Sequence, residues 1–135
     1  MTHLIQVFVY GTLKPGESNY RRYCLGKVVE EYPAIALGQL YALPQGYPAM
    51  TPGDNPVYGY LLAFADPGIL VSLDQLEGYH PSQPREQNDY DRQSIPIFGL
   101  NQELLGTAWG YLMTPKQVEQ QRGILLPGGR WSGQA

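Results

Sequence analysis

The stretch from Ile5 to Gly16 constrains the fold more than any other part of the chain. Branched aliphatic residues at positions 5, 7 and 9 alternate with polar or aromatic residues, a pattern typical of a β-strand. We expect this strand to end at Gly11, because glycine permits backbone angles that other residues resist and Pro15-Gly16 marks a turn. The N–H groups after the strand then have no neighbouring strand to join. Such donors need another partner, and an anionic ligand is a natural one.

Two other interpretations of this stretch stand beside an anion site. One is an ordinary exit from a strand into a tight turn. The other is a nucleotide-binding phosphate loop, because Gly11 and Gly16 have its glycine spacing. That loop continues with Lys and then Ser or Thr, whereas this chain has Glu17-Ser18, and a carboxylate would repel phosphate. The sequence therefore disfavours a nucleotide loop and leaves the first two interpretations open.

Composition narrows the class of protein. A length of 135 residues predicts one domain, and 16 Gly with 12 Pro predict many turns. Eleven tyrosines suit half-polar cavities, since each combines an apolar ring with a hydroxyl group. The net charge of −3, without a basic cluster beyond Arg21-Arg22, argues against a nucleic-acid partner.

The same composition bears on location. The lone cysteine, Cys24, excludes a disulfide within the chain and suits a reducing cytosol. The first ten residues lack the basic and apolar parts of a signal peptide. No segment approaches the roughly 20 apolar residues of a membrane helix. We therefore expect a soluble, cytoplasmic protein without a membrane partner.

The order of expected elements favours an α+β domain built on a curled or closed sheet. We expect residues 1–114 to form this domain and residues 115–135 to be a C-terminal extension of it, in which Gly128-Gly129-Arg130-Trp131 leads into a loose tail. The expected helices are 17–25, 67–77 and a short one over 114–121. The expected strands and extended pieces are 5–10, 28–29, 34–43, 47–50, 57–65, 90–98 and 103–113, with turns at 52–55 and 99–102 and a polar loop over 79–89.

Glu77 is the strongest candidate for chemistry. On the predicted helix it falls within the apolar stripe, four residues after Leu73 and seven after Leu70. An inward carboxyl at a helix C-terminus has a raised pKa, because burial and the helix dipole both disfavour its charged form. Such a group can accept and return a proton near neutral pH. The alternative, a frayed last turn that lets Glu77 reach water, is equally compatible with the pattern.

Other catalytic sets fit the sequence poorly. With His3, His80 and Cys24 as the only histidines and cysteine, a metal site of the usual kind is not expected. Neither histidine lies near a nucleophile signature, which disfavours a Ser-His-Asp triad. An enzyme of this composition would use a carboxylate and backbone dipoles, without a metal, a cofactor or a protein nucleophile.

Four short motifs in order resemble the γ-glutamylcyclotransferase-like family, with its AIG2-like and γ-glutamylamine cyclotransferase branches. The resemblance covers roughly residues 7–113 and implies a small mixed or antiparallel β-barrel flanked by helices, with a cavity at its mouth. The motifs are Tyr10-Gly11-Thr12-Leu13, Leu73-Asp74-x-x-Glu77-Gly78-Tyr79, Tyr90-x-Arg92 and Ala108-Trp109-x-Tyr111.

The resemblance also implies roles for particular residues. Backbone N–H groups of Tyr10, Gly11, Thr12 and Leu13 would hold the glutamyl group of a substrate, and Tyr111 would line the same pocket. Glu77 would be the general acid and base. For Tyr90 and Arg92 we prefer a structural role, as a pair that braces the barrel near the helix, and we expect Trp109 to belong to the core.

The implied reaction is intramolecular. The α-amine of a small-molecule γ-glutamyl substrate would attack its own γ-carbonyl, which releases 5-oxoproline and a free amine or amino acid. Two rivals remain: a small-molecule-binding barrel without catalysis, and an amide hydrolase that uses water. The sequence permits a monomer or a homodimer.

Overall fold

The computed structural model describes residues 4–133, so His3 lies outside the described residues. The strands are β1 (Ile5–Val9), β2 (Val28–Ala42), β3 (Pro48–Phe64), β4 (Asp91–Phe98), β5 (Leu104–Leu112) and β6 (Ile124–Leu125). The helices are α1 (Tyr20–Tyr23), α2 (Ile69–Glu77) and α3 (Pro115–Gln120), with a 3-10 turn, η1 (Arg85–Gln87). No helix within residues 4–133 is both long and apolar enough to cross a bilayer.

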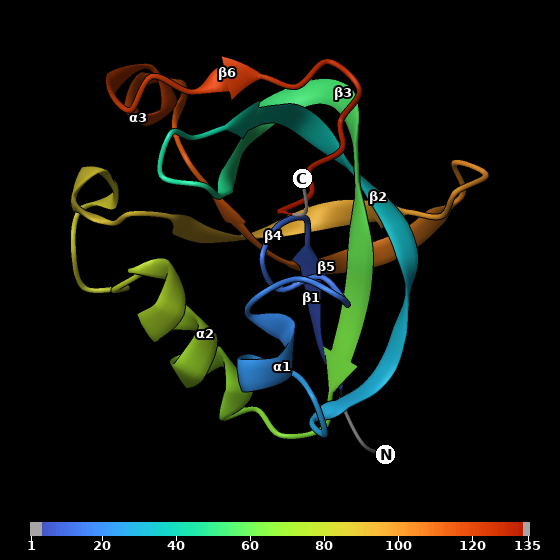
Figure 1. Cartoon of the computed structure of the whole chain (residues 1–135). Helices are drawn as coiled ribbons and strands as arrows, with labels where there is room; N and C mark the ends of the chain where they lie inside the picture. The colour runs from blue at the N-terminus through green and yellow to red at the C-terminus, as the bar shows by residue number, and fades with distance from the viewer. Residues whose placement is uncertain (1–3, 134–135) are drawn as a thin grey trace.

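Five of the strands pair in a closed circuit. The order is β3-β1-β5-β4-β2, and β2 pairs again with β3, so the sheet curls back on itself (Figure 1). β1 lies antiparallel to β3 and parallel to β5, so the sheet is mixed. The expectation of an α+β domain on a curled, barrel-like sheet flanked by helices is confirmed.

Several element boundaries differ from the sequence-based expectation. β2 and β3 are each one long strand, because they pair along most of their length, from Val28 opposite Phe64 to Ala42 opposite Pro48. The turn expected at 52–55 lies inside β3 as an irregularity. The partner of β2 changes there from Asn55 to Thr51, and the residues between them bulge out of the ladder. The first helix is also shorter than the expected 17–25.

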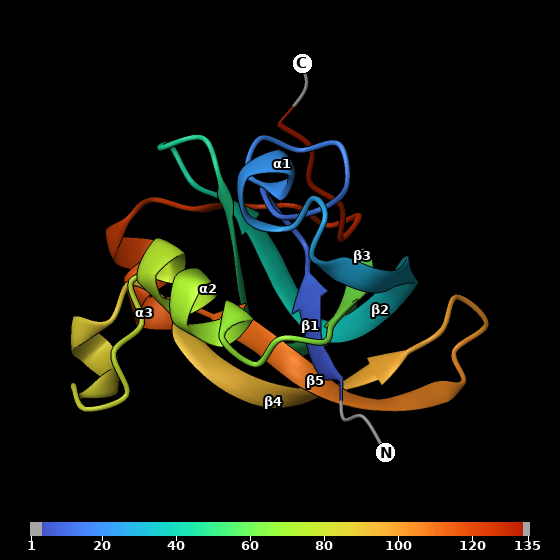
Figure 2. The same ribbon diagram turned by 90° about the horizontal axis from the view of Figure 1, so that it is seen from below.

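The alternation of side chains along β1 divides the core into two clusters. Phe8 and Tyr10 belong to a cluster supplied by all five strands of the circuit, which fills the interior of the curled sheet. Val7 and Val9 point to the opposite face and pack with Ile69 and Leu73 of α2. Figure 2 shows α2 lying over this outer face. The end of β1 therefore lies where the two clusters meet.

The C-terminal segment is packed up to Trp131, and residues 134–135 of the expected loose tail lie outside the described residues. The Tyr58 N–H donates to the Gly129 carbonyl at 2.8 Å, and Leu126 N–H donates to Leu40 at 2.8 Å. Trp131 packs against the interior cluster of the sheet, and Lys14 Nζ donates to its carbonyl. Apolar burial at Trp131 and backbone hydrogen bonds fix this segment, which Gly128-Gly129 alone does not reveal. The division of the chain at residues 114 and 115 stays a prediction.

Gly59 permits the close approach of β3 to β1. A Cβ atom at this position would lie 2.2 Å from the Val9 carbonyl oxygen. We therefore expect Gly59→Ala to lower the free energy of unfolding by about 2 kcal/mol or more, as an overpacked core substitution does. Gly128→Ala is the control, because no atom lies within 4 Å of a Cβ there. Urea unfolding measures both variants, and equal stabilities would contradict the packing at Gly59.

Candidate functional site

A cavity of about 250 Å³ lies at the end of β1. Its walls come from the end of β1 and the bend after it, Asn19, the start of β3, the C-terminal end of α2, the segment that precedes β4, and β5. The structure brings every sequence-predicted site residue to this cavity: Tyr10, Gly11, Thr12, Leu13, Glu77 and Tyr111.

Unpaired amide groups form one wall. Strand β1 ends at Val9, so the next residues leave the ladder as the sequence predicts. Within the described part of the chain, the N–H groups of Gly11, Thr12 and Leu13 donate no hydrogen bond. An amide N–H that faces a cavity without an acceptor favours an anionic or carbonyl ligand there.

Local contacts fix the shape of this bend. Gly11 packs against Pro48, whose Cγ would lie 2.7 Å from a Cβ at position 11. The Thr12 carbonyl accepts from the Asn19 N–H at 2.8 Å, and Thr12 Oγ1 accepts from Asn19 Nδ2 at 2.9 Å. Lys14 N–H donates to the Gly11 carbonyl at 3.0 Å. The bend is therefore held in place before any ligand binds.

Glu77 lines the same cavity and lies on the last turn of α2. Ile69 and Leu73, in the apolar stripe of the helix, are buried. Glu77 follows Leu73 by one helical turn and lines the cavity. Gly78 ends the helix in the left-handed conformation, with φ of 67°. Burial raises the pKa of Glu77 to about 7, and the charge of Asp89 contributes to this shift. Of the two interpretations that the sequence left open, the structure favours the inward carboxyl.

Tyrosines from different strands meet beside Glu77. Tyr10 Oη donates to the Tyr111 carbonyl at 2.6 Å and accepts from the Met50 N–H at 3.2 Å. Tyr90 Oη donates to the Pro48 carbonyl at 2.7 Å. Burial raises the pKa of each of these phenols and of Tyr111, so all of them stay neutral. They are hydrogen-bonding groups and cannot serve as bases near pH 7.

An ion pair joins α2 to the sheet one turn before Glu77. Arg92 Nη1 contacts both carboxylate oxygens of Asp74, at 3.0 and 3.2 Å, and Tyr111 Oη donates to Asp74 Oδ1 at 2.7 Å. The guanidinium lies over the rings of Tyr79 and Trp109, at 5.2 and 4.8 Å. The structure therefore supports the bracing role that we expected for Arg92, whereas Tyr90, expected to act as a pair with it, lines the cavity and bonds to the Pro48 carbonyl.

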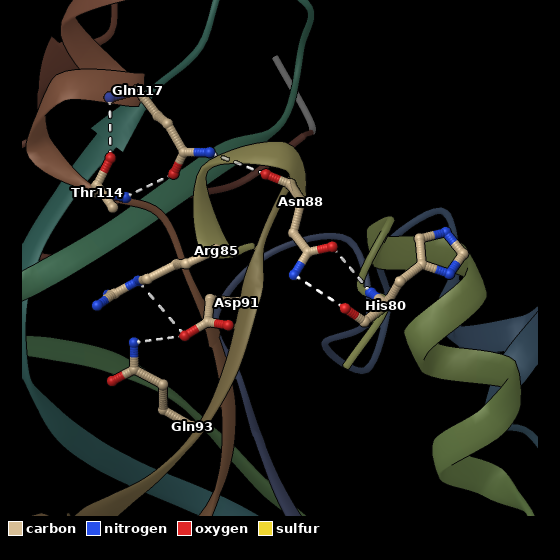
Figure 3. Close-up of polar contacts among 7 residues, drawn as sticks. All are labelled: His80, Arg85, Asn88, Asp91, Gln93, Thr114 and Gln117. Carbon is tan, nitrogen blue, oxygen red and sulfur yellow. Dashed lines mark hydrogen bonds and ion pairs between the residues drawn. The ribbon is translucent and has the colours of Figure 1, made fainter. Parts of the chain in front are cut away.

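Asn88 positions the segment that precedes β4 and that forms part of the cavity wall. Its side chain accepts from the His80 N–H at 2.9 Å and donates to the His80 carbonyl at 3.3 Å (Figure 3). Its carbonyl accepts from Gln117 Nε2 at 2.8 Å, which ties it to α3. The backbone then pairs with the end of α2, since the Tyr90 N–H donates to the Glu77 carbonyl at 3.2 Å. Asp89 is thereby placed beside Glu77.

Sequence reasoning did not identify Asp89 or Asn88 as site residues. It also missed the contacts of Asp74 with Arg92 and Tyr111. Asp89 and Asn88 follow a polar, proline-containing loop, where no periodicity reports which side chains point inward. The motif containing Asp74 was visible, but its partners in β4 and β5 depend on the tertiary fold. No group of three or more His, Cys, Asp or Glu residues in the described ranges could hold a metal ion.

The sequence of this chain is similar to those of known proteins. A family model described as gamma-glutamyl cyclotransferase, AIG2-like, matches residues 7–133. A curated Vibrio cholerae protein with the provisional name gamma-glutamylcyclotransferase is 32% identical over 131 residues, which cover 97% of this chain and 96% of the relative.

Solved structures share the fold. A mouse AIG2-like protein superposes with a TM-score of 0.71 at 20% identity, covering 98% of this chain and 91% of the mouse chain. The Escherichia coli protein ytfP gives a TM-score of 0.57 at 29% identity, covering 94% of this chain and 96% of the other.

The two arginine–aspartate pairs offer a matched comparison of buried and exposed contacts. The side chains of Arg92 and Asp74 are 18% and 17% exposed, whereas those of Arg85 and Asp91 are 43% and 23% exposed. We expect Arg92→Ala to cost about 2–4 kcal/mol of unfolding free energy, because it strands a largely buried carboxylate. Arg85→Ala should cost less than about 1 kcal/mol. Similar losses in urea unfolding would contradict the bracing role of Arg92.

The raised pKa of Glu77 predicts a pH-dependent stability. Between its ordinary value of 4.5 and about 7, the folded chain retains a proton that the unfolded chain has lost. The free energy of unfolding therefore falls as pH rises through this window, by at most about 3 kcal/mol for this group.

Glu77→Gln removes this dependence. The stability of the variant relative to the parent should rise between pH 5 and pH 8, as measured by urea unfolding. Glu86→Gln, at an exposed position outside the cavity, controls for loss of a surface carboxylate. If the difference in unfolding free energy between Glu77→Gln and the parent stays constant with pH, the Glu77 carboxyl is not desolvated.

Proposed function

Because the chain belongs to the gamma-glutamyl cyclotransferase, AIG2-like family, we propose that it releases 5-oxoproline from a γ-glutamyl amine or amino acid. One observation carries the proposal: a carboxyl group of raised pKa and unpaired backbone amides line the same small cavity. A proton-exchanging group and an anion-binding wall are what an intramolecular cyclisation requires. The reaction uses no metal, cofactor or protein nucleophile.

The amide wall would bind the anionic parts of the substrate. The N–H groups of Gly11, Thr12 and Leu13 can receive a carboxylate, or the oxyanion that develops on the γ-carbonyl as the ring closes. Because the bend is already fixed by Asn19 and Pro48, the donors lose little freedom when the substrate binds. Holding the glutamyl chain folded brings its α-nitrogen to its own γ-carbonyl.

Glu77 would move the proton. Ionised Glu77 takes a proton from the α-ammonium, and the neutral α-amine attacks the γ-carbonyl carbon to form the new C–N bond. The original amide C–N bond then breaks, and Glu77 returns its proton to the departing nitrogen. The new ring nitrogen also loses its second proton, which Glu77 passes to the freed amine, so the reaction balances without water and the products are 5-oxoproline and a protonated amine. A pKa of about 7 suits both steps, since the group must first accept and then donate.

The location of the protein is part of the proposal. Cys24 is free and buried, and burial raises the pKa of its thiol to about 11, so it is protected as an uncharged thiol. A chain with one unpaired cysteine suits a reducing compartment, so we place the enzyme in the cytoplasm.

Glu77→Gln is the decisive variant for this reaction. We expect release of 5-oxoproline to fall by about 10²–10⁴-fold, the usual contribution of a general acid–base group, while unfolding stays cooperative. The measurement is a mass-spectrometric screen of γ-glutamyl amino acids, peptides and amines. For the parent, kcat/KM should rise with pH around the Glu77 pKa of about 7, since the ionised form starts the reaction.

The products separate this reaction from its rivals. Free glutamate in place of 5-oxoproline would indicate a hydrolase that uses water, and ligands recovered intact would indicate a binding protein. Glu86→Gln serves as the control and should retain the activity of the parent. Undiminished 5-oxoproline release in Glu77→Gln would remove Glu77 from the mechanism.

A further inference from the structure

The wall of the cavity around Glu77 contains three tyrosine hydroxyl groups, and each donates its hydrogen bond to an acceptor other than Glu77. The Tyr10 hydroxyl donates to the Tyr111 carbonyl, the Tyr90 hydroxyl donates to the Pro48 carbonyl, and the Tyr111 hydroxyl donates to the Asp74 carboxylate. All three phenols lie close enough to Glu77 for its charge to raise their pKa values. None of them donates to the Glu77 carboxyl.

Glu77 consequently has no hydrogen-bond donor among the described residues. Burial and the charge of Asp89 account for its pKa shift, and no hydrogen bond contributes. A carboxylate surrounded by acceptors is poorly stabilised unless a ligand brings donors. The phenol oxygens of Tyr90 and Tyr111 retain lone pairs that can accept from the same ligand.

Asp89 adds a second carboxylate to this wall. It lines the cavity, and its Oδ2 packs so closely on Gly78 that a Cβ there would lie 2.3 Å away. The Asp89 N–H donates to the Gly78 carbonyl at 3.1 Å, which fixes the residue against the end of α2. Its carboxylate makes no ion pair or side-chain hydrogen bond within the described part of the chain.

The bend after β1 contributes donors to the same cavity. It offers the N–H groups of Gly11, Thr12 and Leu13, which donate no hydrogen bond within the described residues. The cavity lining therefore combines donors with acceptors. This arrangement matches a ligand that carries an anionic group and an ammonium group a few bonds apart.

We propose that Asp89, with the hydroxyl oxygens of Tyr90 and Tyr111, forms a binding site for a primary ammonium group and holds it against Glu77. The Asp89 carboxylate serves as the counter-ion, while Glu77 exchanges the proton. Asp74 is a positioning residue here, because it accepts the hydrogen bond of the Tyr111 hydroxyl and so leaves that oxygen free to act as an acceptor. The inference rests on the proposed cyclisation and makes a free α-amine a condition of binding.

The separate roles of the two carboxylates follow from their surroundings. Glu77 is the more enclosed group, whereas the Asp89 side chain is exposed at the rim of the cavity. An ammonium ion between them is attracted by both, and burial gives the Glu77 carboxyl a pKa of about 7, which suits it to take the proton near pH 7. Loss of the Asp89 charge should therefore weaken binding and also lower the pKa of Glu77.

The test measures head-group binding without depending on the leaving amine. L-glutamine is the smallest γ-glutamyl amide with a free ammonium group, N-acetyl-L-glutamine lacks the ammonium, and 5-oxoproline is the proposed product. Each is titrated by NMR into Glu77→Gln protein, which cannot turn the probe over. We expect L-glutamine and 5-oxoproline to bind, and N-acetyl-L-glutamine to bind at least roughly tenfold more weakly than L-glutamine.

Asp89→Asn, added to Glu77→Gln, isolates the second carboxylate. Asparagine has nearly the same shape, so the packing on Gly78 is retained. We expect the affinity for L-glutamine to fall roughly tenfold, as for loss of a hydrogen bond to a charged group, with little change for 5-oxoproline. Glu86→Gln in the same background is the matched control and should change neither affinity.

The outcomes distinguish this inference from the proposed function. Equal binding of L-glutamine and its N-acetyl derivative would overturn the ammonium site, as would an unchanged L-glutamine affinity in Asp89→Asn. Parallel loss of both L-glutamine and 5-oxoproline in Asp89→Asn would assign a merely structural role to Asp89. If neither L-glutamine nor 5-oxoproline shifts the signals of cavity residues in any of these proteins, the γ-glutamyl site itself is wrong.

Discussion

A carboxyl group that lacks a hydrogen-bond donor, enclosed at the end of a helix, is the constraint on which the site depends. Glu77 lies among phenols whose protons are bonded to other acceptors, and beside a second carboxylate, Asp89. Burial and the charge of Asp89 make ionisation of Glu77 harder. The folded chain thus holds a proton acceptor whose charged form receives no hydrogen bond from the described residues. We interpret this instability as the basis of proton transfer at the site.

The fold maintains this arrangement through rigid contacts on each side. The closed circuit of strands fixes where β1 ends, and Gly59 lets β3 approach β1 closely enough for that closure. The Asp74–Arg92 pair attaches α2 to β4, while the hydroxyl of Tyr111 attaches it to β5. Because Glu77 follows Asp74 by one helical turn, this anchor also sets the depth of its carboxyl in the cavity.

The sequence predicted the site better where chemistry is local than where it depends on tertiary contacts. The alternation of β1, its end before Gly11 and the inward stripe that contains Glu77 are properties of short segments, and the structure has all three. The resemblance to a family then related segments far apart in the chain. β2 and β3 were wrongly divided, because their pairing overrides the turn signal at Pro52-Gly53.

The contributions of Asp89 and Asn88 could not be predicted in this way. Both belong to an irregular segment whose direction is set by His80, by Gln117 of α3 and by the end of α2 (Figure 3). The packed C-terminal segment was missed for a similar reason, since Trp131 meets a core assembled from distant strands. Local propensity carries no information about such partners.

A direct measurement of the Glu77 pKa tests the central physical claim. In protein labelled with ¹³C at glutamate side chains, the Glu77 carboxyl signal is assigned by its absence in Glu77→Gln and followed from pH 4 to pH 9. A midpoint near 7 is the predicted result. A midpoint near the ordinary value of 4.5 would show a well-solvated carboxylate and would contradict the proposed role of Glu77.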